Sequence, residues 1–309
     1  MKILCATDLL GKSDAAVDRA GVLAAQLSAE LHLLHVVPAV PSHDGQHPQL
    51  REASEKMKER TRSPQWRHGP APHTAIRIGS PAKTLIQTAE DLRADLIVLG
   101  PHAERASSEA LSGTIAARML SERRCPVLIV RQPVQGSYRD VLLALDVRAT
   151  SPAVIRAAES LVLHEEMSVS VVHSSHFPHT AMLDAIGLTQ ESSAGYDGKI
   201  IDQALKEVRE LLARASNGTI LYNVVVRNDP PATAIESAAR RTHPQLIVMG
   251  TRGQGPLRRA LLGSVANQVL KSATTDVLVV PEESLAHEKG TWSPADTVPV
   301  AGDARENPS

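Results

Sequence analysis

The stretch QLIVMGTRGQGPLRRALLGSVANQVLK, residues 245–271, joins an apolar run, a glycine-rich loop and an amphipathic segment. The run 245–249 has the composition of a buried strand. Residues 264–271 are typical of a helix, for which Ser264 is the predicted N-cap. A strand, a glycine-rich loop and a capped helix in this order present backbone N–H groups to an anion.

The loop between them includes glycines at 250, 253 and 263. Glycine suits positions with positive φ, or positions where a phosphate comes closer to the backbone than a Cβ would allow. Three arginines and no acid give the loop a formal charge of +3; they are Arg252, Arg258 and Arg259. A triphosphate is the predicted ligand of such a loop.

The spacing G-x-x-G, nine residues, then G-[ST] resembles the ATP-binding motif of the universal stress protein family, and it is formed by Gly250, Gly253, Gly263 and Ser264. The loop itself contains neither Gly-Lys-Ser/Thr nor G-x-G-x-x-G. The resemblance implies that it holds ATP, carried with Mg²⁺. The alternative is a flexible connection whose glycines only make turns.

Length and composition limit the class of protein. A chain of 309 residues suits about two domains. A net charge of −1 argues against a nucleic-acid-binding face, and 2% aromatic residues argues against base-stacking platforms. Cys5 and Cys125 form no disulfide or metal pattern, so buried, inert thiols are expected. The start does not fit a signal peptide and no run approaches transmembrane length, so we expect a cytoplasmic protein without a membrane partner.

Apolar strands alternate with helical segments along the first half, which predicts a parallel sheet covered on both faces. The predicted strands are 3–6, 31–37, 75–78, 96–99 and 127–130. The same order repeats at an offset of 138 residues as far as His173, which matches His35, and at an offset of 150 beyond it. The extra residues fall in a predicted loop from Ser174 to Ile200. The fold class predicted is therefore α/β, with two tandem doubly wound, Rossmann-like domains.

The predicted domains are 1–132 and 140–283, joined by a linker at 133–139 and followed by a disordered tail at 284–309. The resemblance to the universal stress protein family covers nearly everything except the tail. It implies that the two halves pack as an internal pseudo-dimer through 127–130 and 277–280. A further homodimer and an unknown protein partner stay open.

By the same resemblance, Asp146 at the end of the second half's first strand helps to fix the nucleoside; the alternative is an Asx turn leading into the next helix. Ser174 stands where the family often has an aliphatic residue beside the base. The nucleotide-binding residues that the resemblance implies are Asp146, Ser174, Gly250, Arg252, Gly253, Gly263, Ser264 and Val265.

The first half's version of the loop, GPHAERASSEALSGT at 100–114, departs from the motif. Ala103 replaces the middle glycine, and Pro101 stiffens the entry. Glu104 and Glu109 against Arg105 give it a formal charge of −1. Such a loop is a poor triphosphate site. We therefore expect ATP in the second half only.

Several histidines are further candidates for metal ligands or packing residues. His173, His176 and His179 are spaced so that they could meet on a zinc ion, although a polar surface loop is the simpler interpretation. His32 and His35 are interpreted as packing histidines. No catalytic residues are assigned, because no triad, H-E-x-x-H or carboxylate pair can be placed.

The function predicted is an ATP-binding stress-response regulator or sensor, at most a slow ATPase. The alternative is a non-catalytic interaction, small-molecule or metal-binding module with vestigial nucleotide sites.

Overall fold

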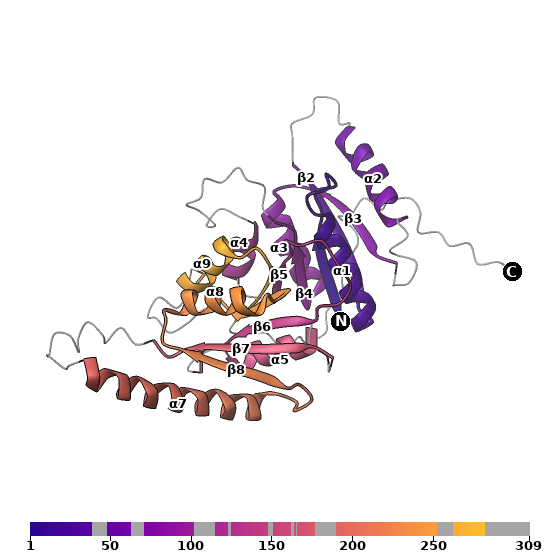
Figure 1. Cartoon of the computed structure of the whole chain (residues 1–309). Helices are drawn as coiled ribbons and strands as arrows, with labels where there is room; N and C mark the ends of the chain where they lie inside the picture. The colour runs from indigo at the N-terminus through magenta and orange to yellow at the C-terminus, as the bar shows by residue number, and fades with distance from the viewer. Residues whose placement is uncertain are drawn as a thin grey trace. The chain divides into compact units, whose positions relative to one another are not determined.

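The computed structural model describes residues 1–38, 48–62, 71–101, 115–122, 125–147, 151–161, 164, 166–176, 190–251 and 262–281. These residues fall in two compact units, within Met1–Ser137 and Tyr138–Glu283. Each unit is a parallel sheet with helices on both faces (Figure 1), which confirms the predicted α/β class with two doubly wound repeats. The predicted tail at 284–309 lies outside the described residues. Within the described part, no helix is long and apolar enough to span a bilayer.

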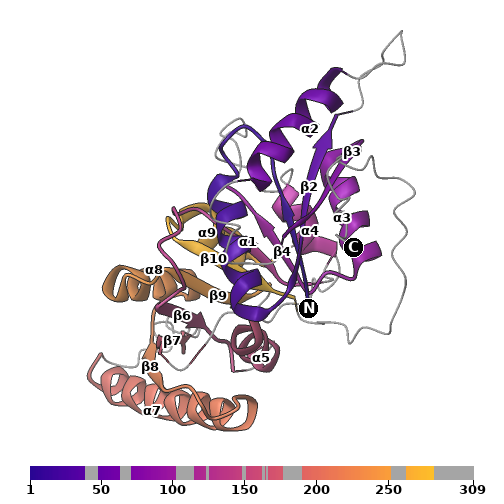
Figure 2. The same ribbon diagram turned by 90° about the vertical axis from the view of Figure 1, so that its right-hand side faces the viewer.

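In the first unit the strand order is β3-β2-β1-β4-β5, and neighbouring strands are parallel. The strands are β1 (Lys2–Ala6), β2 (Glu30–Val37), β3 (His73–Ile78), β4 (Leu96–Leu99) and β5 (Val127–Ile129). The helices are α1 (Asp14–Leu27), α2 (Pro48–Thr61), α3 (Pro81–Leu92) and α4 (Ile115–Glu122). Helix α2 lies along β2 and β3 (Figure 2) and is tied to α1 by Arg60, while α3 packs with α4. The helices therefore cover the sheet in pairs, one pair on each face.

The second unit has the same plan, with the order β10-β9-β6-β7-β8. Its strands are β6 (Asp140–Ala144), β7 (Ser168–Ser174), β8 (Tyr222–Arg227), β9 (Leu246–Gly250) and β10 (Asp276–Val280). Its helices are α5 (Ser151–Leu161), α7 (Gln190–Ala215), α8 (Pro231–Thr242) and α9 (Ser264–Ser272). Helix α5 packs with α7, which runs along β8 in Figure 1, and α8 packs with α9.

The strands are apolar throughout because helices cover both of their faces. Every residue of β4 and of β10 is buried. The charged residue in this set is Asp276, whose carboxylate accepts a hydrogen bond of 2.6 Å from the buried hydroxyl of Tyr138. In the first unit, the Arg19 guanidinium donates to the carbonyl oxygen of Gly136 at 2.6 Å, which holds the predicted linker against α1.

The predicted loop from Ser174 to Ile200 is wrong at its far end, because α7 begins at Gln190. The first turns of this helix contain Gly195 and Gly198 and few apolar residues, so the sequence shows no amphipathic pattern before Ile201. Strand β8, for which no range was predicted in the second half, pairs with β7 at the outer edge of the sheet.

Candidate functional site

In the second unit the strand order reverses between β6 and β9. The chain leaves β6 for β7 on one side and later enters β9 on the other. Ligands of such sheets bind beyond the carboxyl ends of the strands at this point. Ala144, the last residue of β6, pairs with both Val172 and Met249. Because of this register, Asp146, which follows β6, lies at the same sheet edge as Ser174 and Gly250.

The glycine-rich loop leaves and re-enters this edge through Thr251 and Gly263. The N–H of Thr251 donates to the carbonyl oxygen of Val280 at 3.0 Å, and its own carbonyl accepts from the N–H of Gly263 at 2.9 Å. Thr251 is 2% exposed, and its hydroxyl has no hydrogen-bond partner among the described residues. Leaving such a group unpaired costs about 1–3 kcal/mol. Thr251 is not among the site residues predicted from the sequence. The sequence feature that could have indicated it is a hydroxyl residue directly after Gly250, the last residue of the strand.

Helix α9 begins at this edge without a side-chain cap. Its N-cap is Gly263, with φ −58° and ψ 150°, and Ser264 is its first residue, so the predicted N-cap at Ser264 is wrong. Ser264 is already inside the helix and so does not occupy the N-cap position, and Gly263, which does, has no side chain that could cap it. The first N–H groups of the helix, which include those of Ser264 and Val265, have no acceptor within it. An anion would satisfy them and would also be favoured by the helix dipole.

Positive φ does not explain the glycines on either side of the loop. Gly263 has a negative φ, and Gly250 is not among the described glycines in the left-handed region. Close approach to the backbone remains the reason that the sequence offers for them. The predicted contacts Arg252 and Gly253 lie outside the described residues, as do Arg258 and Arg259.

Ser174 already makes hydrogen bonds within the protein. Its hydroxyl donates to the carbonyl oxygen of Asp229 at 2.6 Å and accepts from the N–H of His176 at 3.3 Å. Asp229 in turn accepts a hydrogen bond of 2.7 Å from Arg227 Nε. Ser174 therefore positions the turn between β8 and α8, and its contact with a base stays a prediction.

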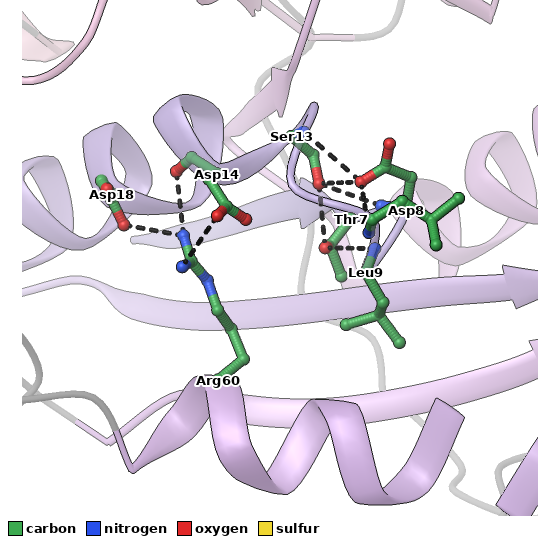
Figure 3. Close-up of polar contacts among 8 residues, drawn as sticks. Thr7, Asp8, Leu9, Ser13, Asp14, Asp18 and Arg60 are labelled. Atoms are coloured by element: carbon green, nitrogen blue, oxygen red, sulfur yellow. Dashed lines mark hydrogen bonds and ion pairs between the residues drawn. The ribbon is translucent and has the colours of Figure 1, made fainter. Parts of the chain in front are cut away.

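The matching edge of the first unit is occupied by its own hydrogen bonds (Figure 3). Ser13 donates from Oγ to Asp8 Oδ1 at 2.7 Å, and the same Oγ accepts from the Asp8 N–H at 3.0 Å. The Thr7 hydroxyl lies 3.0 Å from Ser13 Oγ and accepts from the N–H of Leu9 at 3.1 Å. Asp8 Oδ1 also accepts from the N–H of Leu10 at 3.0 Å. One oxygen of the Asp8 carboxylate is thus used to hold the turn into α1.

Gly100 packs directly against this network. A Cβ on Gly100 would lie 3.1 Å from Ser13 Cα and 3.3 Å from the Lys12 carbonyl oxygen. The backbone of the first unit therefore fills the space beside Gly100. Pro101 follows it, while Ala103, Glu104 and Glu109 lie outside the described residues.

The histidines differ in their partners. His35 is a packing histidine as predicted, with Nδ1 2.8 Å from the Thr7 carbonyl oxygen. His32 stacks on His73, but its Nε2 atom is buried without a hydrogen bond. His173 is buried, and its Nδ1 lies 2.9 Å from the carbonyl oxygen of Leu145. Among the described residues, neither His173 nor His176 joins a group of three possible metal ligands. His179 lies outside them.

Comparison with known proteins adds the family. The model of the universal stress protein family matches residues 1–131 and 137–281. A universal stress protein of Mycolicibacterium smegmatis is 27% identical over 293 residues, which is 90% of this chain and 96% of that protein. Universal stress protein MJ0531 of Methanocaldococcus jannaschii is 29% identical over 140 residues, 43% of this chain and 82% of that protein. In fold, the crystal structure of a universal stress protein from Archaeoglobus fulgidus matches with a TM-score of 0.59 at 20% identity, over 91% of this chain and 98% of that one.

Proposed function

The chain belongs to the universal stress protein family, and we propose that it binds ATP with Mg²⁺ at the carboxyl edge between β6 and β9 of its second unit. In this proposal the phosphates lie against the start of α9 and the glycine-rich loop. Asp146 holds the nucleoside end. The protein acts as a stress-response regulator whose state depends on the bound nucleotide.

The buried hydroxyl of Thr251 is the observation that carries the proposal. It is an unpaired polar atom at the mouth of the loop, next to Gly250 and to the uncapped start of α9. Unpaired donors at one sheet edge are what a polyphosphate requires, because its oxygens accept hydrogen bonds and its charge is stabilised by a helix N-terminus. The residues present therefore fit the ligand.

The corresponding edge of the first unit differs in its hydrogen bonds and in the charge of its loop. Its network of Thr7, Asp8 and Ser13 uses the hydroxyl and carboxylate groups at the corresponding edge. At the offset of 138 residues, Leu145 replaces Thr7, so the second unit cannot repeat that network. Together with the charge difference between the loops, +3 against −1, this favours one nucleotide per chain.

We propose that the protein regulates through its bound nucleotide and does not turn it over rapidly, because no nucleophile and no general base can be assigned in the sequence.

Isothermal titration of the full chain with MgATP tests the binding, with an expected stoichiometry near one. Chromatography of the nucleotide after several hours tests hydrolysis, and most of it is expected to remain ATP. A stoichiometry of two would contradict the restriction to the second unit. Absence of binding would favour the interaction module with vestigial sites.

A further inference from the structure

Three possible metal ligands meet at the amino-terminal ends of β2 and β3 in the first unit. Glu30 and His32 are two residues apart on β2, so their side chains point to the same face of the sheet. His73, the first residue of β3, pairs with His32 in the strand register. One ligand atom from each of the three side chains lies within 4.8 Å of the other two.

The geometry of the two imidazoles is favourable for a shared ligand. Their ring centroids are 4.8 Å apart, with planes inclined by 20°. His32 Nε2 is buried and lies 3.5 Å from Glu30 Oε2, which is too long for a directed hydrogen bond. Buried nitrogen atoms are normally paired, so this atom needs an explanation. The His32 side chain is 12% exposed and that of Glu30 is 57% exposed, so solvent can reach the cluster from the carboxylate side.

The charged groups near His32 act in opposite directions. Burial, followed by the neighbouring His73, lowers the pKa of His32, while Glu30 opposes the shift and Lys2 adds to it. The positive charge of Lys2, on the adjacent strand β1, works against a cation, and the carboxylate of Glu30 works for it.

We propose that Glu30, His32 and His73 bind a divalent transition-metal ion, with Zn²⁺ as the ion to test first. Two imidazoles and one carboxylate, with water in the fourth position, form a common zinc ligand set. Zinc–ligand bonds of about 2.0–2.2 Å place tetrahedral ligand atoms roughly 3.4 Å apart. The exposed side chains of Glu30 and His73 can close the remaining distance by changing rotamers. The site lies at the amino-terminal ends of its strands and does not depend on the proposed nucleotide site.

Titration of the full chain with Zn²⁺ tests the proposal when wild type is compared with two variants. His73→Ala and Glu30→Gln change exposed side chains, and each is expected to weaken this binding event at least tenfold. His176→Ala, in the second unit, and His243→Asn, at a helix C-cap that tolerates asparagine, serve as controls and should leave it unchanged. An unchanged titration in His73→Ala would overturn the proposal.

Because the chain has 13 histidines, a second measurement must locate the ion. Anomalous scattering at the zinc edge, from crystals of the full chain grown with Zn²⁺, is expected to give a peak between Glu30, His32 and His73. A peak only at other histidines, or no peak, would also overturn the assignment.

Discussion

The Nδ1 atom of His173 lies 2.9 Å from the carbonyl oxygen of Leu145, immediately before Asp146. Since a carbonyl can only accept, Nδ1 carries the proton and donates. The first unit has the same contact, from His35 to the Thr7 carbonyl at 2.8 Å, immediately before Asp8. In each unit a histidine near the end of the second strand therefore holds the backbone next to the aspartate.

Replacing this histidine in each unit distinguishes its effect on ATP binding from its effect on the stability of the fold. His173→Leu leaves the Leu145 carbonyl without its buried donor, so the free energy of unfolding should fall by about 1–3 kcal/mol. ATP affinity should fall as well, because Asp146 loses its support. His35→Leu removes the equivalent bond and should lower stability without changing ATP affinity. Chemical denaturation and calorimetric titration measure both effects; an equal loss of affinity in the two variants would contradict the placement of ATP.

The two aspartates offer a matched pair for the nucleotide itself. Asp146→Asn should weaken ATP binding about tenfold, or about 1.4 kcal/mol, because a charged acceptor is lost. Asp8→Asn should leave ATP affinity unchanged, and it should lower stability because Asp8 Oδ1 holds the turn around Ser13. Titration of both variants decides the matter: the assignment fails if Asp8→Asn is the variant that loses ATP.

The repeat and most strands could be predicted because they depend on local pattern. Leu96–Leu99 was predicted to the residue, since an apolar run of four between polar segments has one sensible strand assignment. Helix α7 shows where prediction from local pattern fails, because its first turns are helical in spite of Gly198. No pattern in the sequence marks a helix that begins among glycines.

The polar contacts of the sites depend on strand register, which sequence patterns do not reveal. Ser174 and Asp229 are 55 residues apart, and their hydrogen bond follows from the pairing of Ser174 with Arg227. His32 and His73 likewise become neighbours only through the pairing of β2 with β3. The motif therefore indicated candidate contacts, without Thr251, and the fold was needed to show that Ser174 is already hydrogen-bonded within the protein.

The thiols provide a pH-dependent test of burial. Cys5 and Cys125 are buried and free, as predicted, and burial raises the pKa of each to about 12. At pH 8 the thiolate fraction in the folded chain is therefore about one in ten thousand, so neither thiol should react with a disulfide reagent until the protein unfolds. The pKa of each thiol is higher in the folded chain than in the unfolded chain. The protonated thiols therefore make their full contribution to the free energy of unfolding below about pH 8.5, and this contribution is lost as the pH rises above that value. Rapid reaction of one thiol in native protein would show that its unit opens.

The linker allows a test of the proposed internal pseudo-dimer. A protease site introduced at Gln135 would cut the chain beside Gly136, whose carbonyl is held by Arg19. If the family's pairing applies, the two fragments should co-elute in gel filtration at the position of the intact chain. An uncut chain with the same site inserted is the control. Fragments that elute separately as monomers would exclude the pseudo-dimer.

Thr251→Val is the sharpest test of the phosphate site, because it removes one oxygen atom and keeps the shape of the side chain. The hydroxyl is buried and has no partner among the described residues, so its loss should leave the free energy of unfolding unchanged or raise it by up to about 1 kcal/mol. If the hydroxyl donates to a phosphate, ATP affinity should fall by roughly ten- to a hundredfold, which is the value of one hydrogen bond to a charged group.

Thr88→Val is the matched control for this substitution. Thr88 is equally buried, in the first unit, and its hydroxyl donates to the Thr84 carbonyl at 2.7 Å. Loss of that bond should not stabilise the protein, and ATP affinity should stay as in wild type. If Thr251→Val alone lowers ATP affinity and leaves the free energy of unfolding unchanged, the Thr251 hydroxyl contacts the ligand. A hydroxyl with a purely structural role would instead change the free energy of unfolding and leave ATP affinity as in wild type. Equal ATP affinity in Thr251→Val and wild type would remove Thr251 from the site.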